Sequence, residues 1–106
     1  MRRLAALLPL VFAAGSACAG DIPDAARRGQ LVEMIRQDCG ACHGLTLKGG
    51  LGPSLEPAAM QARDAEQLSF VILNGRHGTP MPPWRSQLTE GEARWIAGAL
   101  KRGLPK

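Results

Sequence analysis

The chain has 106 residues and a formal net charge of +4, a length typical of one small domain. Its basic residues form no run with interleaved aromatic side chains, so the sequence predicts no nucleic-acid partner. Part of the positive charge lies at the very start, and removal of Arg2 and Arg3 would lower the net charge to +2.

Residues 1–19 have the composition of a secretory signal peptide. A positively charged start is followed by an apolar run over residues 4–14 and by small residues before Gly20. The apolar run is shorter than a bilayer-spanning helix needs to be. We therefore predict cleavage that leaves a mature domain, residues 20–106, in the periplasm with no stable membrane insertion. An uncleaved anchor and a lipoprotein acylated at Cys18 are the alternatives.

Two segments of the mature domain have the apolar spacing of amphipathic helices. The first covers residues 24–38 and carries Leu31 and Ile35 on an apolar stripe. The second covers residues 64–74, where Asp64 is a suitable N-cap residue. An Asn-Gly pair ends this second segment, as is common at helix C-termini.

A third helix is predicted to start at Thr89. Glu92 stands three residues further on, where the two side chains can cap the helix reciprocally, and Gly103 ends the segment. Two loops rich in Gly and Pro, residues 44–57 and 76–87, separate the three helices. Because no strand pattern, repeat or second domain is present, the sequence predicts an all-α fold with three main helices.

The sequence Cys39-Gly-Ala-Cys42-His43 has the spacing of a c-type haem attachment site. The two thiols can add to the two vinyl groups of one porphyrin edge, and the adjacent imidazole can then lie under the iron. Gly40 and Ala41 are small and leave that edge unobstructed. We predict one covalent haem c, held through Cys39 and Cys42, with His43 as an axial ligand of the iron.

The pair of cysteines has three other interpretations. A thioredoxin-like redox pair would need a preceding strand and a βαβ context, which the pattern lacks. A zinc site would need two further ligands, for which the mature chain offers only His77 and carboxylates. A structural disulfide would leave His43 unexplained. Export agrees with covalent haem, because this kind of attachment takes place outside the cytoplasm in bacteria.

Met81 is the predicted sixth ligand of the iron. Three prolines surround it in the segment 78–84 and make the loop rigid, so that one side chain is presented in one direction. A thioether ligand raises the reduction potential of haem iron. Met34 and Met60 are interpreted more simply as packing residues. His77 is the rival ligand, but on a glycine-flanked stretch a histidine is more often solvated.

The carbonyl of Pro53 is the predicted acceptor for the second ring nitrogen of His43. A ligating histidine commonly donates its other N–H to a carbonyl, and proline fixes the loop that presents this one. An ordinary turn proline is the alternative. Trp84 and Trp95 are interpreted as packing residues, and Arg76 as either a propionate partner or a solvated arginine.

These residues together resemble a monohaem class I cytochrome c over the whole mature chain. The resemblance implies three helices wrapped around the haem, axial ligands His43 and Met81, and one haem edge exposed for electron transfer. Residues 38–55 and 74–84 are in addition similar to the NirC-type cytochromes, small periplasmic proteins that accompany the haem-d1 nitrite reductase. One departure is that the first helix has no aromatic residue, which many class I cytochromes use to contact the last helix.

The resemblance implies a monomeric one-electron carrier rather than an enzyme, with a redox partner that is a periplasmic nitrite reductase of denitrification. A factor that assists haem d1 maturation or insertion is one alternative. A ligand-binding or peroxidase-like haem protein is another, and it requires that Met81 is absent from the iron or dissociates easily. With Met81 bound, a six-coordinate iron has no open position for a substrate.

Overall fold

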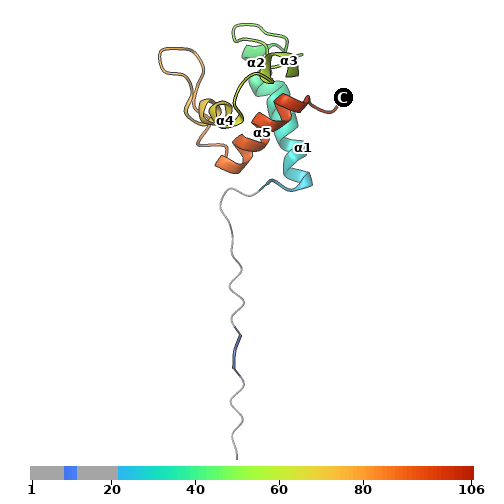
Figure 1. Cartoon of the computed structure of the whole chain (residues 1–106), viewed down its shortest axis with the longest axis vertical. Helices are drawn as coiled ribbons and strands as arrows, with labels where there is room; N and C mark the ends of the chain where they lie inside the picture. Colours follow the sequence, from blue (N-terminus) through green and yellow to red (C-terminus); the bar gives the residue numbers. More distant parts are fainter. Residues whose placement is uncertain (1–8, 12–21) are drawn as a thin grey trace, which may run out of the picture.

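The computed structural model describes residues 9–11 and 22–106 of the chain. The regular elements in these ranges are helices without any strand, which confirms the predicted all-α class (Figure 1). None of the described helices has the length and apolar character required to traverse a membrane. The predicted signal peptide, residues 1–19, lies outside the described residues except for its short stretch 9–11.

The first helical stretch is longer than predicted. It comprises α1 (Ala25–Met34), the π-helical turn η1 (Ile35–Cys39) and α2 (Gly40–His43). Asp24 caps its start by accepting a hydrogen bond from the backbone N–H of Arg27 at 2.8 Å. The predicted end, before the haem motif, was too early. The chain leaves the helix only at Gly44, whose φ of +89° is a conformation that suits glycine.

Three further helices complete the described part of the chain: α3 (Pro57–Met60), α4 (Ala65–Asn74) and α5 (Glu90–Arg102). The side chain of Asp64 accepts a hydrogen bond from the N–H of Gln67 at 3.0 Å, as the N-cap prediction requires. Thr89 and Glu92 form the predicted reciprocal capping box. A glycine with positive φ follows both α4 and α5.

The hydrophobic core forms where α5 packs against α4, α3 and the first helical stretch (Figure 1). Its buried side chains are Leu31, Ile35, Leu47, Met60, Leu73, Leu88, Ala93, Ile96 and Leu100. Leu31 and Ile35 are fully buried and pack in the same cluster as residues of α5. These aliphatic side chains take the place of the aromatic residue that many class I cytochromes have in the first helix. Trp84 and Trp95 pack partly buried against the same cluster, as predicted.

Polar contacts fix both ends of α5. At its start, the guanidinium of Arg27 on α1 forms an ion pair and hydrogen bond with Glu92. At its end, the ammonium of Lys101 donates hydrogen bonds to the carbonyls of Gln61 and Arg63, just after α3. These contacts hold α5 across the other helices, which carry the loop after α2 and the loop after α4.

Candidate haem site

The residues of the haem motif end the first helical stretch against a tightly folded loop. The N–H of Gly49 donates to the carbonyl of His43, and the N–H of Gly52 donates to the carbonyl of Cys42, each at 2.8 Å. Two carbonyls that the helix end would leave without partners are thereby satisfied. At Gly44 an added Cβ would lie 2.6 Å from the Gly49 carbonyl oxygen, so this close approach also requires glycine. The loop that follows the helix therefore folds back directly against the end of that helix.

The imidazole of His43 is held by the same loop. Its Nδ1 lies 2.7 Å from the carbonyl oxygen of Pro53, the acceptor predicted from the sequence. Because a carbonyl can only accept, Nδ1 carries the proton, and Nε2 keeps the lone pair that a metal ion requires. The half-buried ring also lies against the backbone of Gly52, where a Cβ would stand 2.6 Å from Cε1 and 2.7 Å from Nδ1. The ring is thus fixed in both tautomer and position.

The two cysteines of the motif differ in exposure. Cys39 is half-buried, Cys42 is exposed, and both are free thiols. Burial raises the pKa of the Cys39 thiol from 9.0 to about 11, and the nearby charge of Asp38 adds to this effect. A thioredoxin-like pair needs the opposite, a lowered pKa that produces a thiolate near neutral pH. The environment of Cys39 therefore argues against a thiol-disulfide redox site.

Met81 lies on a second loop, residues 75–83, which follows α4. We call this segment the Met81 loop. The N–H of Arg76 donates to the carbonyl of Met81 at 3.2 Å, so the chain closes on itself at a narrow neck. Gly75 lies inside the neck with φ of +70°, and a Cβ there would stand 2.6 Å from the Met81 carbonyl oxygen. Further on, the N–H of Trp84 donates to the carbonyl of Ile72 at 3.0 Å and fixes the loop to α4.

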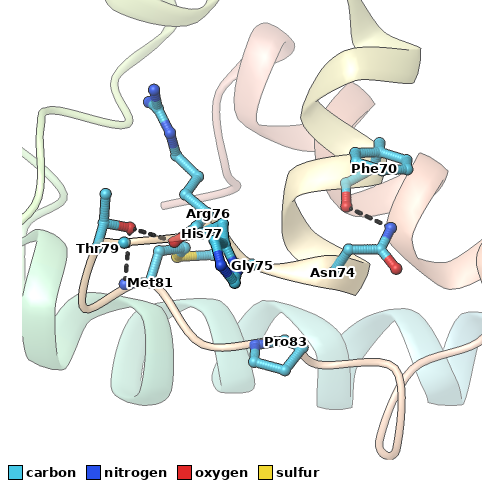
Figure 2. A pocket seen from close by; sticks show the side chains of 9 residues that line it. Phe70, Asn74, Gly75, Arg76, His77, Thr79, Met81 and Pro83 are labelled. Atoms are coloured by element: carbon cyan, nitrogen blue, oxygen red, sulfur yellow. Dashed lines mark hydrogen bonds between the residues drawn. The ribbon is translucent and has the colours of Figure 1, made fainter.

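An open pocket of about 530 Å³ lies along the Met81 loop (Figure 2). It is lined by Phe70, Asn74, Gly75, Arg76, His77, Gly78, Thr79, Met81 and Pro83. Met81 is half-buried, whereas Phe70 is 65 % exposed although it is a large apolar side chain. Met81 and His77, which lie close together in the sequence, therefore also line one pocket.

The predicted site residues thus lie at one helix end and on two loops. His43 and Pro53 are in direct contact, with Cys39 and Cys42 on the helix that ends at His43, whereas Met81 is on the other loop. Both loops lie in the upper part of Figure 1. Gly52 was not predicted as part of the site. Its position directly before Pro53, the predicted hydrogen-bond acceptor, could have indicated that it lies beside the His43 ring.

This donor set fits a covalently attached haem. Two thiols stand one helical turn apart on a helix end, and the following imidazole has its Nε2 available. The glycine backbone against the ring leaves space that any Cβ would fill. A second loop supplies a thioether that lines a pocket.

Known proteins resemble this chain both in sequence and in structure. The family model described as "Cytochrome C oxidase, cbb3-type, subunit III" matches residues 24–98. Cytochrome c55X of Paracoccus denitrificans (strain Pd 1222) is 57% identical over 100 residues, which cover 94% of this chain and 94% of that protein. The solved structure of "c-type cytochrome NirC" is 48% identical, with a TM-score of 0.75, and the match covers 77% of this chain and 96% of that one.

A second solved structure is larger than this chain. It is titled "Dihydro-heme d1 dehydrogenase NirN in complex with DHE", is 35% identical with a TM-score of 0.62, and the match covers 70% of this chain but 16% of that one. The similarity to NirC and to cytochrome c55X, by contrast, extends over nearly the whole of those proteins. The chain therefore belongs to the c-type cytochromes, as a relative of NirC.

Proposed function

We propose that this chain is a periplasmic one-electron carrier that donates electrons to a haem-d1 nitrite reductase. Haem c would be attached through Cys39 and Cys42, and its iron would be ligated by His43 and Met81. The observation that carries the proposal is the hydrogen bond between His43 Nδ1 and the Pro53 carbonyl, because it prepares Nε2 as an iron ligand.

When bound, haem c would supply one-electron exchange between ferrous and ferric iron. The residues of the chain determine the conditions of that exchange. The carbonyl of Pro53 holds the proton on Nδ1 of His43 and raises the basicity of the ligating nitrogen. The thioether of Met81 favours the ferrous state and thereby raises the reduction potential. With both side chains on the iron, no coordination position is open to a substrate, which favours electron transfer over catalysis.

The proposed partner follows from the relatives. NirC is similar over 96% of its chain, and the resemblance noted for residues 38–55 and 74–84 links this type of cytochrome to the haem-d1 nitrite reductase. Such a carrier needs only transient contact with its partner, because outer-sphere electron transfer requires no bond between the two proteins. A monomer in the periplasm meets that need.

Stopped-flow mixing of the reduced holoprotein with oxidised haem-d1 nitrite reductase tests this proposal. We expect rapid oxidation of haem c, with a rate that rises with reductase concentration and falls with ionic strength if charges steer the encounter. The reduced holoprotein should also show an unchanged spectrum under carbon monoxide. Failure of haem c to become oxidised by the reductase would contradict the proposed partner, and rapid formation of a carbon monoxide adduct would contradict the carrier function.

A second candidate function is assistance in haem d1 maturation. The observation that favours it is the similarity to the dihydro-haem d1 dehydrogenase structure, which contains a region of this fold. The two functions differ in the effect of a gene deletion. Loss of a maturation factor would leave reductase without haem d1, whereas loss of an electron donor would leave intact reductase that turns over slowly. Haem d1 content of the purified reductase distinguishes them.

A further inference from the structure

We infer that His77 is a reserve axial ligand, whose imidazole takes the sixth position of the haem iron when the Met81 thioether is lost. This inference rests on the proposed ligation by Met81 and goes beyond it. Both side chains line the same open pocket of about 530 Å³, and Figure 2 shows them together along the Met81 loop. Two side chains able to ligate iron therefore face one space.

The backbone of the Met81 loop explains why they are neighbours. The hydrogen bond from Arg76 N–H to the Met81 carbonyl brings the two arms of the loop together, and His77 follows Arg76 directly. Gly75 makes this pairing possible, because any Cβ there would collide with the Met81 carbonyl. His77 and Met81 therefore leave the backbone at adjacent points of the same neck.

His77 also has freedom that Met81 lacks. It lies in a turn that Thr79 closes. The backbone N–H of Thr79 donates to the carbonyl of Arg76 at 3.1 Å, and the Thr79 hydroxyl donates to the same carbonyl at 2.7 Å. Gly78 supplies the positive φ of that turn, +75°, and an added Cβ would meet nothing within 4 Å. The His77 ring is exposed. By contrast, prolines on either side of Met81 restrict its backbone.

The chemistry of the two side chains determines what replacement of the Met81 thioether by the His77 imidazole would change. A thioether binds ferric iron weakly, whereas an imidazole ligates both oxidation states and lowers the potential relative to the thioether. Replacement of Met81 by His77 would keep the iron six-coordinate and low-spin. The iron would then remain closed to small ligands such as carbon monoxide even without its thioether. The carrier would lose driving force but would not become a ligand-binding haem protein.

The test uses holoprotein variants at the two positions, with Met81→Leu preserving side-chain volume and Met81→Ala as a second form. Covalent haem content is checked by mass before any other measurement. We expect both single variants to stay low-spin but to show a ferric EPR signal of the bis-imidazole type in place of the His/Met signal. We also expect a lowered potential and slow carbon monoxide binding. Combining either with His77→Ala should remove the low-spin signal and speed carbon monoxide binding. The matched control combines Met81→Leu with Arg76→Gln, which changes the neighbouring pocket residue and should retain the bis-imidazole signal.

The outcomes separate this inference from the proposed function. A high-spin Met81→Leu protein would overturn the role of His77 and leave Met81 ligation standing. A Met81→Leu protein with the same spectrum and potential as the unmodified one would overturn Met81 ligation itself. Loss of the low-spin signal in His77→Ala alone would make His77 the resident ligand. A bis-imidazole signal that vanishes on dilution would assign the imidazole to a second molecule and equally overturn the inference.

Discussion

The backbone of Gly52 lies directly against the imidazole of His43, so close that a Cβ at position 52 would stand 2.6 Å from the ring carbon Cε1. Such a distance is far inside van der Waals contact, and the ring cannot retreat without losing its hydrogen bond to the Pro53 carbonyl. One loop thus sets both the orientation of the ring, through Pro53, and the space beside it, through Gly52. The ring that we propose as the iron ligand is therefore held by the fold of this loop itself.

The first prediction is that Gly52→Ala disturbs the haem site. The added methyl group displaces the His43 ring and costs the hydrogen bond to Pro53, which contributes on the order of 1 kcal/mol. We expect a lower yield of covalent holoprotein, a lower melting temperature and partial high-spin character in the ferric absorption spectrum. Gly29→Ala is the matched control. Position 29 is helical with nothing within 4 Å of the added Cβ, so this change should stabilise the protein by about 0.5–1 kcal/mol. Equal spectra for the two variants would contradict the role of Gly52.

The second prediction concerns the reduction potential. Met81→Ala removes the thioether that favours ferrous iron, so the potential should fall by on the order of 0.1 V, a fraction of the range that axial ligands span. Potentiometric titration of the holoprotein measures the change. Met60→Leu is the control, because Met60 is 3% exposed in the hydrophobic core and its loss should alter stability rather than potential. A potential that changes with Met60→Leu and not with Met81→Ala would reverse the assignment.

The third prediction is that Cys39→Ala together with Cys42→Ala abolishes covalent haem. No thiol of the motif would remain to add to a vinyl group, and the mass of the denatured protein should equal that of the polypeptide alone. Because Cys39 packs partly buried against the core, the apoprotein should also lose helical order, which circular dichroism measures. Covalent haem in the double variant would disprove the attachment sites, and a fully helical apoprotein would show that folding does not depend on the cofactor.

Local features of this fold could be predicted from the sequence, whereas contacts between distant segments could not. The capping box of Thr89 and Glu92 was predictable because both residues act within one helical turn. The continuation of the first helix through η1 was not, since its end depends on the positive φ of Gly44 and on hydrogen bonds from the following loop. Likewise, the ion pair between Arg27 on α1 and Glu92 on α5 joins residues 65 positions apart, and no local pattern in the sequence indicates it.

The fourth prediction concerns the pH dependence of stability at the contact of α1 with α5. The hydrogen bond and charge of Arg27 hold the pKa of Glu92 below its ordinary value of 4.5, although partial burial opposes the shift. Since the folded pKa lies below the unfolded one, this stabilisation is complete above about pH 4.5 and is lost as the pH falls through the lowered value. Arg27→Gln should therefore reduce the free energy of unfolding at pH 7 by about 0.2–1 kcal/mol, with a smaller effect at pH 3.

Denaturant unfolding of the holoprotein at several pH values measures this difference. Arg94→Gln is the matched control on α5, the helix that carries Glu92. The ion pairs of Arg94 with Glu66, at 3.2 Å, and with Glu90, at 3.8 Å, join side chains that are largely exposed. Solvent screens such pairs, so their removal should change stability less than Arg27→Gln does. The Thr89 N–H also bonds the Glu92 carboxylate and keeps part of the shift, so the pH dependence of Arg27→Gln should weaken without disappearing. An Arg27→Gln protein whose loss of stability is the same at pH 3 and pH 7 would show that Arg27 acts through packing rather than through charge.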